Sequence, residues 1–226
     1  MGVIVLLGPP GAGKGTQAQI LTRELGYPHV ATGDLFRAAV REGSPLGHEV
    51  RRYMDRGLLV PDPITIRVLL DRLDRPDARS GAILDGFPRT RAQAEALDAA
   101  LSERGSGLEA AVLIDVPSDQ VVDRLTRRWV CQAGGHVYNE LTNPPRVPGR
   151  CDVDGSPLVQ RADDRIETVR ARLDQQLDAL AEVVGYYEQR GILRRVDGTA
   201  PIPIVSDAIF RALGRRPSEP ARAAEA

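Results

Sequence analysis

The feature that most constrains the fold is the stretch from Gly8 to Thr16, which reads GPPGAGKGT. It follows the apolar run 3–7 and precedes an amphipathic segment that begins near Thr16. A short buried strand, a glycine-rich turn and a helix, in this order, are typical of a phosphate-binding loop. Glycines let consecutive backbone N–H groups face one anion, and the helix N-terminus adds the positive end of its dipole. The sequence therefore predicts a P-loop in which Lys14 reaches the outer phosphates and Thr16 offers a hydroxyl to Mg²⁺.

One departure and one compositional fact sharpen this prediction. The strict motif places Ser or Thr directly after the lysine, whereas Gly15 intervenes here. Lys14 is also the only lysine among 30 basic residues, since all the others are arginines. A compact ammonium on a flexible stem suits a crowded phosphate cradle better than a planar guanidinium does. The alternative, a Gly/Pro turn that binds nothing, leaves the flanking strand and helix patterns unexplained.

Bulk composition fits an ordinary globular protein. The chain has 226 residues, 42% hydrophobic and 27% charged, so its core needs neither a disulfide nor a metal. Its net charge of −1 provides no basic field for nucleic acid. Without an 18-residue apolar run or a secretory signal, we expect no membrane span. Two cysteines, Cys131 and Cys151, fit a reducing compartment and predict a cytoplasmic protein.

Apolar runs alternate with helical patterns along most of the chain. The continuously apolar run 110–116 and the short apolar run 82–85, which ends in an acid, predict buried strands. A brief strand is expected over 27–30, and the last strand over 193–196. Helices are expected over 16–25, 35–42, 46–56, 62–74, 90–104, 118–128, 163–190 and 202–214. Thr32-Gly33-Asp34 is typical of the residues that start a helix. The alternation predicts an α/β fold whose parallel sheet is covered by helices on both faces.

The alternation stops between about 129 and 162. This stretch contains glycines, prolines, both cysteines and an Asp154-Gly155 turn, and it has no helical period. It predicts a small β-rich insertion. Residues 215–226 are expected to be a disordered tail.

Several further motifs resemble those of the adenylate kinase family, in its long-lid bacterial form. In chain order they are TGDLFR at 32–37, DGFPRT at 85–90, DRL at 123–125, RADD at 161–164 and VDGT at 196–199. With the GKGT loop they cover residues 1 to about 214. The resemblance implies a P-loop NTPase-type core of residues 1–30, 61–128 and 163–214. It also implies an AMP-binding helical insertion at 31–60, a lid at 129–162 and a monomer.

The resemblance implies reversible transfer of a phosphoryl group, in which MgATP and AMP give MgADP and ADP, a reaction that balances adenine nucleotides. No nucleic acid or membrane partner is implied. Phosphoryl transfer asks mainly for positioning and for cations around a charged, in-line transition state. Besides Lys14, five arginines match the charge-clamping positions of the family: Arg37, Arg89, Arg124, Arg161 and Arg172. The alternative for each arginine is a solvated surface charge.

The family also suggests a role for each of these residues. Arg37 and Arg89 would hold the AMP phosphate, and Arg124 would meet the ATP side. Arg161 also meets the ATP side and, with Arg172, would converge on the transferring group as the lid closes. Asp85 would orient magnesium-bound water, its alternative being a helix or turn cap.

The positions that match nucleotide contacts fall into two sets. Those on the ATP side are Gly11, Ala12, Gly13, Lys14, Gly15, Thr16, Arg124, Arg128, Val137, Tyr138 and Ala200. Those on the AMP side are Thr32, Arg37, Leu58, Val60, Gly86, Arg89, Gln93, Arg161 and Arg172. Val137 and Tyr138 would pack against the ATP base. Gln93 would read the adenine edge, its alternative being a place on an exposed helix face.

The lid also raises the question of a metal. Many relatives with long lids carry a four-cysteine zinc site, whereas here Gly134 replaces the second cysteine and Asp154 the fourth. His136 can supply the missing ligand, which gives Cys131, His136, Cys151 and Asp154 as a closed structural zinc site. The alternative is a metal-free lid held by hydrogen bonds. His29 and His48, with no partner pattern near them, are expected to be surface or packing residues.

Two other functions compete with this interpretation. Cytidylate, guanylate and shikimate kinases share the loop but are not expected to combine DGFPR with a long lid that ends in RADD. A catalytically idle nucleotide-binding module is not expected to keep Lys14, Asp85 and all five clamp arginines.

Overall fold

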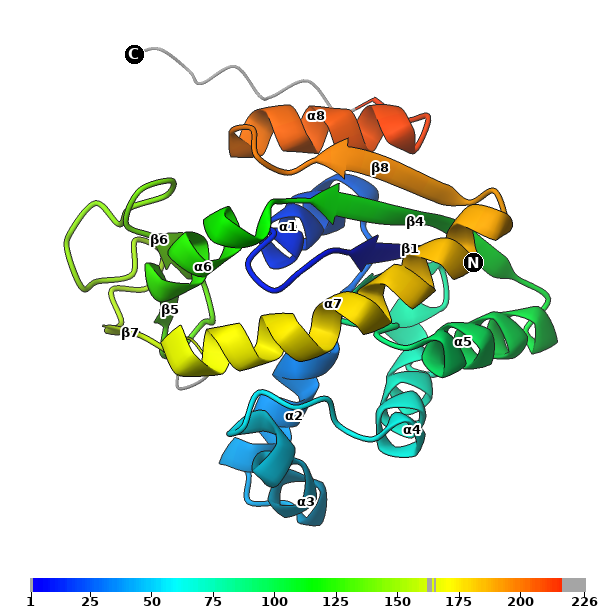
Figure 1. The fold of residues 1–226 in the computed structure, drawn as a ribbon, viewed down its shortest axis with the longest axis horizontal. Helices are drawn as coiled ribbons and strands as arrows, with labels where there is room; N and C mark the ends of the chain where they lie inside the picture. Colours follow the sequence, from blue (N-terminus) through cyan, green and yellow to red (C-terminus); the bar gives the residue numbers. More distant parts are fainter. Residues whose placement is uncertain (1, 162–163, 165, 217–226) are drawn as a thin grey trace.

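The computed structural model describes residues 2–161, 164 and 166–216, with side chains at all of these except 171, 172, 174 and 175. In the described chain, five parallel strands form a central sheet in the order β2-β3-β1-β4-β8. Figure 1 labels β1, β4 and β8 of this sheet. They are β1 (Gly2–Leu7), β2 (His29–Ala31), β3 (Gly81–Asp85), β4 (Gly107–Asp115) and β8 (Leu193–Asp197). Parallel neighbours require crossover connections, and the helices between the strands supply them. The predicted α/β class is confirmed.

Both faces of the sheet are buried at its inner strands β1, β3 and β4, because their successive side chains point to opposite faces and are mostly apolar. In β1, Val3, Val5 and Leu7 belong to one core cluster, and Ile4 and Leu6 belong to the other. Helices pack on both clusters. The first contains side chains of α4 (Asp62–Leu73), α5 (Arg91–Glu103) and α7 (Ile166–Gln189). The second contains side chains of α1 (Lys14–Leu25), α6 (Ser118–Thr126) and α8 (Ile202–Ala212).

A helical unit of α2 (Thr32–Arg41) and α3 (Pro45–Met54) projects at the bottom of Figure 1. It has its own apolar cluster, which includes Phe36, Val50 and Val60. The helix α2 begins at Thr32, three residues earlier than predicted. The Thr32 hydroxyl donates to the carbonyl oxygen of Gly86 (2.8 Å) and does not cap the helix, whose N-cap is the extended residue Ala31.

A second, antiparallel sheet lies at the opposite end of α7 from the chain's last strand, in the order β6-β5-β7 (Figure 1). Its strands are β5 (Arg128–Cys131), β6 (Val137–Asn139) and β7 (Leu158–Val159). The expected β-rich insertion is therefore present. It begins one residue earlier than predicted, because Arg128 pairs with Asn139 in this sheet and does not extend α6. The Asp154-Gly155 turn is formed, with Gly155 at a φ of 71° and its N–H donating to Cys151.

Element boundaries elsewhere differ from the predictions by a few residues. Strand β4 begins at Gly107 and not at residue 110, because its register with β1 starts with the pair Gly2 and Gly107. A 3-10 turn, η1 (Pro76–Ala78), precedes β3. The predicted start of α7 at residue 163 and most of the predicted tail lie outside the described residues. Among the helices that the structure describes, none is both long and apolar enough to cross a membrane.

Candidate active site

The loop between β1 and α1 has the backbone that its glycines predict. Gly8, Gly11 and Gly13 have φ angles of 140°, 80° and 95°. A Cβ at Gly8 would lie 2.5 Å from the carbonyl oxygen of Ile114, and one at Gly11 would lie 2.8 Å from Cγ of Leu125. Both the conformation and the close approach of neighbouring atoms therefore favour glycine at these two positions.

Lys14 is the first residue of α1, directly after this loop. Its ammonium donates to the carbonyl oxygens of Gly8 and Pro9, both at 2.9 Å. The hydrogen bonds of the helix begin at Gln17, so the N–H groups of the first turn face the loop. An ammonium and a helix N-terminus thus converge on one place, which is the arrangement that binds phosphate.

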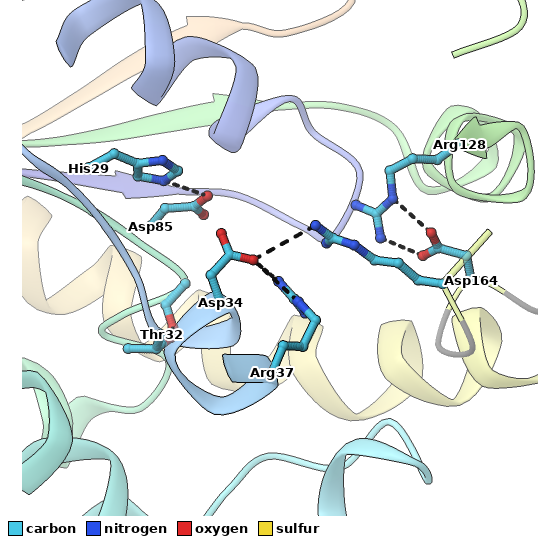
Figure 2. Close-up of polar contacts among 9 residues, drawn as sticks. His29, Thr32, Asp34, Arg37, Asp85, Arg128 and Asp164 are labelled. Atoms are coloured by element: carbon cyan, nitrogen blue, oxygen red, sulfur yellow. Dashed lines mark hydrogen bonds and ion pairs between the residues drawn. The ribbon is translucent and has the colours of Figure 1, made fainter. Parts of the chain in front are cut away.

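Asp85 ends β3 beside this loop and contacts a histidine. Nε2 of His29 lies 3.3 Å from Oδ2 of Asp85 (Figure 2). Burial tends to raise the pKa of Asp85, but the contact with His29 and the charge of Lys14 hold that pKa below its usual value. Asp85 is therefore an ionised carboxylate at the carboxyl edge of the sheet, where ligands of parallel α/β folds bind. The expectation that His29 is a surface or packing residue was wrong; only His48 is exposed as expected.

Two of the predicted clamp arginines meet at one acid. Arg37 donates to Oδ1 of Asp34, and Nη2 of Arg161 lies 3.8 Å from the same oxygen. Figure 2 shows Arg37 and Asp34 facing one another at the start of α2. Arg172 lies in α7, but its side chain is outside the described part of the structure.

Three other predicted arginines are anchored by backbone or acid partners. Arg89 donates through Nε to the carbonyl oxygen of Gly86 (2.8 Å), and Arg124 donates to that of Gly198 (2.9 Å). Arg128 forms a two-point ion pair with Asp164, whose side chain is fully buried (Figure 2). Such partners fix guanidinium planes before any ligand arrives, which favours recognition of phosphate groups.

These residues line two pockets that adjoin. The larger is a cleft of about 1270 Å³ that runs from the P-loop to the second sheet. Among the predicted ATP-side residues it is lined by Gly11, Ala12, Gly13, Lys14, Gly15, Thr16, Arg124, Arg128, Val137, Tyr138 and Ala200. The smaller pocket, of about 60 Å³, is lined by the predicted AMP-side residues Thr32, Arg37, Leu58, Val60, Gly86, Arg89 and Gln93.

The two pockets share five lining residues, and two of these are arginines. Gly33, Arg37, Gly86, Arg89 and Gln176 line both. Gln93 has 1% of its surface exposed, which rules out its alternative place on an exposed helix face. The ring of Tyr138 lies mainly in the small core of the second sheet, where its hydroxyl accepts from the N–H of Asp152 (2.7 Å).

Four potential metal ligands converge in the second sheet and its loops. The ligand atoms of Cys131, His136, Cys151 and Asp154 all lie within 4.8 Å of one another. Nδ1 of His136 is 3.2 Å from Sγ of Cys151, and Sγ of Cys131 is 3.2 Å from Oδ2 of Asp154. The backbone N–H of Ser156 and the Cys131 side chain hold the pKa of Asp154 well below its usual value. The four residues that sequence analysis selected are therefore brought together.

Comparison with known proteins decides the family. A family model described as adenylate kinase matches residues 6–192. The chain belongs to the adenylate kinase family. An adenylate kinase of Moorella thermoacetica is 54% identical over 212 residues, which are 94% of this chain and 98% of the relative. An adenylate kinase of Clostridium botulinum (strain Eklund 17B / Type B) is 48% identical over 94% of this chain and 99% of the relative. One of Carboxydothermus hydrogenoformans is 47% identical over 93% of this chain and 98% of the relative.

Membership of the adenylate kinase family makes the chain an enzyme, a nucleotide-binding transferase of the kinase class. The P-loop, the clamp arginines and Asp85 were all selected from sequence. Several residues that connect them were not: His29, Asp34, Asp62, Asp164 and Gln176. Asp34 and Asp164 lie inside motifs that were recognised, so their positions signalled a role. His29, Asp62 and Gln176 act on residues more than 30 positions away in the chain, and no local pattern marks them.

Proposed function

We propose that this enzyme transfers a phosphoryl group reversibly from MgATP to AMP and so produces two ADP. The observation that carries the proposal is the junction of the two pockets at Arg37 and Arg89. A donor cleft that begins at a P-loop opens, across two guanidinium groups, into a smaller pocket lined by a buried amide. This arrangement suits in-line transfer between two nucleotides whose phosphates meet over fixed positive charges.

On the donor side, the loop from Gly11 to Thr16 would bind the ATP phosphates through backbone N–H groups and Lys14. Arg124, Arg128 and Ala200 line the same cleft. Thr16 and Asp85 are the residues that would hold Mg²⁺, because an ionised carboxylate and a hydroxyl at the phosphate site are the hard oxygen ligands that this ion prefers. The ion would supply positive charge at the phosphates as negative charge moves between them.

On the acceptor side, Arg37 and Arg89 would bind the AMP phosphate. The base would enter the smaller pocket, which Thr32, Leu58, Val60, Gly86 and Gln93 line. Because the acceptor is itself a phosphate oxygen, the reaction needs no covalent nucleophile from the protein. The other contribution of the enzyme is exclusion of water, which would otherwise accept the phosphoryl group.

We assign the exclusion of water to the β-rich unit, residues 129–162, which would act as a lid. Residues 31–60 would be the AMP-binding unit, and the remaining residues to 214 would form the core. In adenylate kinases, as in several other enzyme classes, a lid closes over the bound substrates. We assign the same motion to this unit by analogy. Arg161 lies near the end of the lid and already contacts Asp34 of the AMP-binding unit. Closure would bring it, with Arg172, to the transferring group.

A structural Zn²⁺ in the lid is part of the proposal. The set of two thiols, one imidazole and one carboxylate fits tetrahedral zinc. Gly134 supports this fit, since a Cβ there would lie 2.3 Å from Cε1 of His136, so the imidazole occupies the space that a side chain at position 134 would need. The competing arrangement is a lid held by the same four side chains through hydrogen bonds alone.

From the family resemblance and the net charge of −1, we further propose a monomeric cytoplasmic enzyme with no nucleic acid or membrane partner. Cys131 and Cys151 are free thiols although they lie in one cluster. Free neighbouring thiols fit a reducing compartment.

The proposal is tested by incubating the purified chain with ATP, AMP and Mg²⁺ and measuring ADP. We expect two ADP for each ATP consumed, and no ADP when AMP or Mg²⁺ is omitted. The reverse reaction should yield ATP and AMP from ADP. Binding of both nucleotides without turnover would identify an idle binding module and overturn the proposal.

Replacing Arg37 by alanine is expected to raise the KM for AMP about 10- to 100-fold, because a charge-assisted contact to the phosphate is lost. The KM for ATP should stay within about twofold, because the contact proposed for Arg37 is with the AMP phosphate and not with ATP. Initial rates over a grid of both substrates measure the two constants. Arg51→Ala, an exposed arginine of α3, is the matched control and should change neither.

Replacing His29 by alanine is expected to lower kcat about tenfold at limiting Mg²⁺, because Asp85 loses the contact that orients its carboxylate. His29→Gln keeps an N–H at similar reach and should retain most of the activity. Titrating Mg²⁺ at saturating ATP and AMP measures the effect, with the exposed His48→Ala as the control. A Mg²⁺ dependence that is identical in wild type and His29→Ala would contradict this role.

A further inference from the structure

The side-chain amide of Gln93 is buried at the smaller pocket and both of its ends are engaged. Oε1 accepts from the backbone N–H of Arg89 at 2.8 Å. Nε2 donates to Oδ1 of Asp62 at 2.7 Å. Gln93 lines the pocket, whereas Asp62 does not. Asp62 therefore acts on the pocket through Gln93.

These two contacts fix which way the amide faces. A backbone N–H can only donate, and an ionised carboxylate can only accept. Rotating the amide by half a turn would set NH₂ against the N–H of Arg89 and Oε1 against the carboxylate of Asp62. Both contacts would become repulsive inside a buried site, where unsatisfied polar groups are costly.

Asp62 is itself held in place. It is the first residue of α4, and its second carboxylate oxygen accepts from the Thr90 hydroxyl at 2.8 Å. The same hydroxyl accepts from the backbone N–H of Gln93 at 3.2 Å and so caps α5. The start of one helix therefore positions the carboxylate that orients an amide on the next.

With these bonds made, the amide of Gln93 retains one N–H and one acceptor lone pair for a ligand, in a fixed order. The Watson–Crick edge of adenine carries the N1 acceptor beside the N6 amino donor. Hypoxanthine has the same shape but the reverse order, with an N1–H donor beside the O6 acceptor. An amide of fixed orientation can match only one of these edges.

We propose that Asp62 is a positioning residue that sets the base selectivity of the acceptor site by fixing the orientation of the Gln93 amide. The inference rests on the proposed function, because it takes the smaller pocket as the site for AMP. Without Asp62, one of the two contacts that oppose rotation of the amide is gone. A rotated amide would then accept a hypoxanthine base.

The experiment compares AMP with IMP as acceptor at saturating ATP and measures kcat/KM for each. We expect wild type to prefer AMP by at least about 100-fold. Asp62→Ala should lower that preference about tenfold, through both a loss for AMP and a gain for IMP. Asp62→Asn should stay within about threefold of wild type, because its carbonyl oxygen still accepts from Gln93 while its NH₂ faces Thr90.

The controls separate positioning from a general structural effect. Asp119→Ala removes an exposed acid from the first turn of α6 and should leave the AMP to IMP ratio unchanged. Melting temperatures establish which variants are folded. If Asp62→Ala does not fold, Asp62→Ser replaces it, with an expected fall of at least about threefold in the same ratio.

The outcomes distinguish the inference from the function on which it rests. Suppose that wild type phosphorylates AMP and that Asp62→Ala or Asp62→Ser has the same ratio of kcat/KM for AMP to kcat/KM for IMP as wild type. The role of Asp62 would then be wrong, and the kinase reaction would be unaffected. Equal losses for AMP and IMP would also overturn that role, because a loss without selectivity is what structural damage produces. A wild type that does not phosphorylate AMP overturns both.

Discussion

Replacing Lys14 by methionine is expected to lower kcat about 10³-fold, which corresponds to about 4 kcal/mol of transition-state stabilisation. Lys14 is the one lysine of the chain, and its ammonium sits in the P-loop at 2.9 Å from two carbonyl oxygens. Methionine has a similar length and flexibility but no charge, so the loop can keep its shape. The loss should therefore appear in kcat with a much smaller change in melting temperature.

Lys14→Arg is the more discriminating variant. It keeps the positive charge, but a planar guanidinium cannot place one compact donor between the carbonyl oxygens of Gly8 and Pro9. We expect it to rescue no more than about a tenth of the lost activity. Arg23→Met removes an exposed charge from the last turn of the same helix and should leave kcat unchanged. If Lys14→Met kept more than about a tenth of wild-type kcat, the assigned role of the loop would be wrong.

The parts of the site that sequence predicted are those encoded by a local pattern. The P-loop requires positive φ at fixed glycines directly between a strand and a helix, so its residues are contiguous and their spacing is diagnostic. The inner strands β1, β3 and β4 were recognisable because burial on both faces makes them apolar along most of their length. Their order in the sheet leaves no such trace, since nothing local specifies that β1 lies between β3 and β4.

The residues that sequence analysis missed act over long separations. His29 and Asp85 are 56 positions apart, Asp62 and Gln93 are 31 apart, and both pairs meet because neighbouring strands or helices pack together. His29 lies three residues before the recognised motif at 32–37, but that motif gives no sign that a histidine there has a partner. Only the pairing of β2 with β3, in which Ala31 is opposite Asp85, brings His29 to that carboxylate.

Removing one lid ligand is the second prediction with a large expected effect. Purified wild type should contain about one zinc per chain, and Cys151→Ser should contain none, because three remaining ligands do not close a tetrahedral structural site. The melting temperature should fall by at least about 5 °C, since metal binding stabilises the folded lid and not the unfolded chain. Elemental analysis and thermal unfolding measure the two effects, and neither depends on turnover.

Gly134→Ala tests the site without touching a ligand. Its Cβ would lie 2.3 Å from Cε1 of His136 and 2.9 Å from Oδ2 of Asp154, so two ligands must move. We expect this single methyl group to lower zinc affinity about 10- to 100-fold, as loss of ligand orientation does at other metal sites. The control is Gly185→Ala on α7, where an added Cβ meets no atom within 4 Å, and it should leave the zinc content unchanged. Gly155→Ala would not serve, because Gly155 has a positive φ that strains any other residue.

A double variant completes the argument. Gly134→Cys with His136→Ala removes the imidazole that fills the space at position 134 and offers a thiolate there instead, so zinc should be retained. Retention in the double variant together with loss in Gly134→Ala would show that Gly134 and His136 act as an exchangeable pair. An active wild type with no metal, whose melting temperature is unchanged by Cys151→Ser, would instead show that the lid needs no ion. The contacts of Cys131 with Asp154 and of His136 with Cys151 would then be hydrogen bonds in their own right, and the kinase reaction would be unaffected.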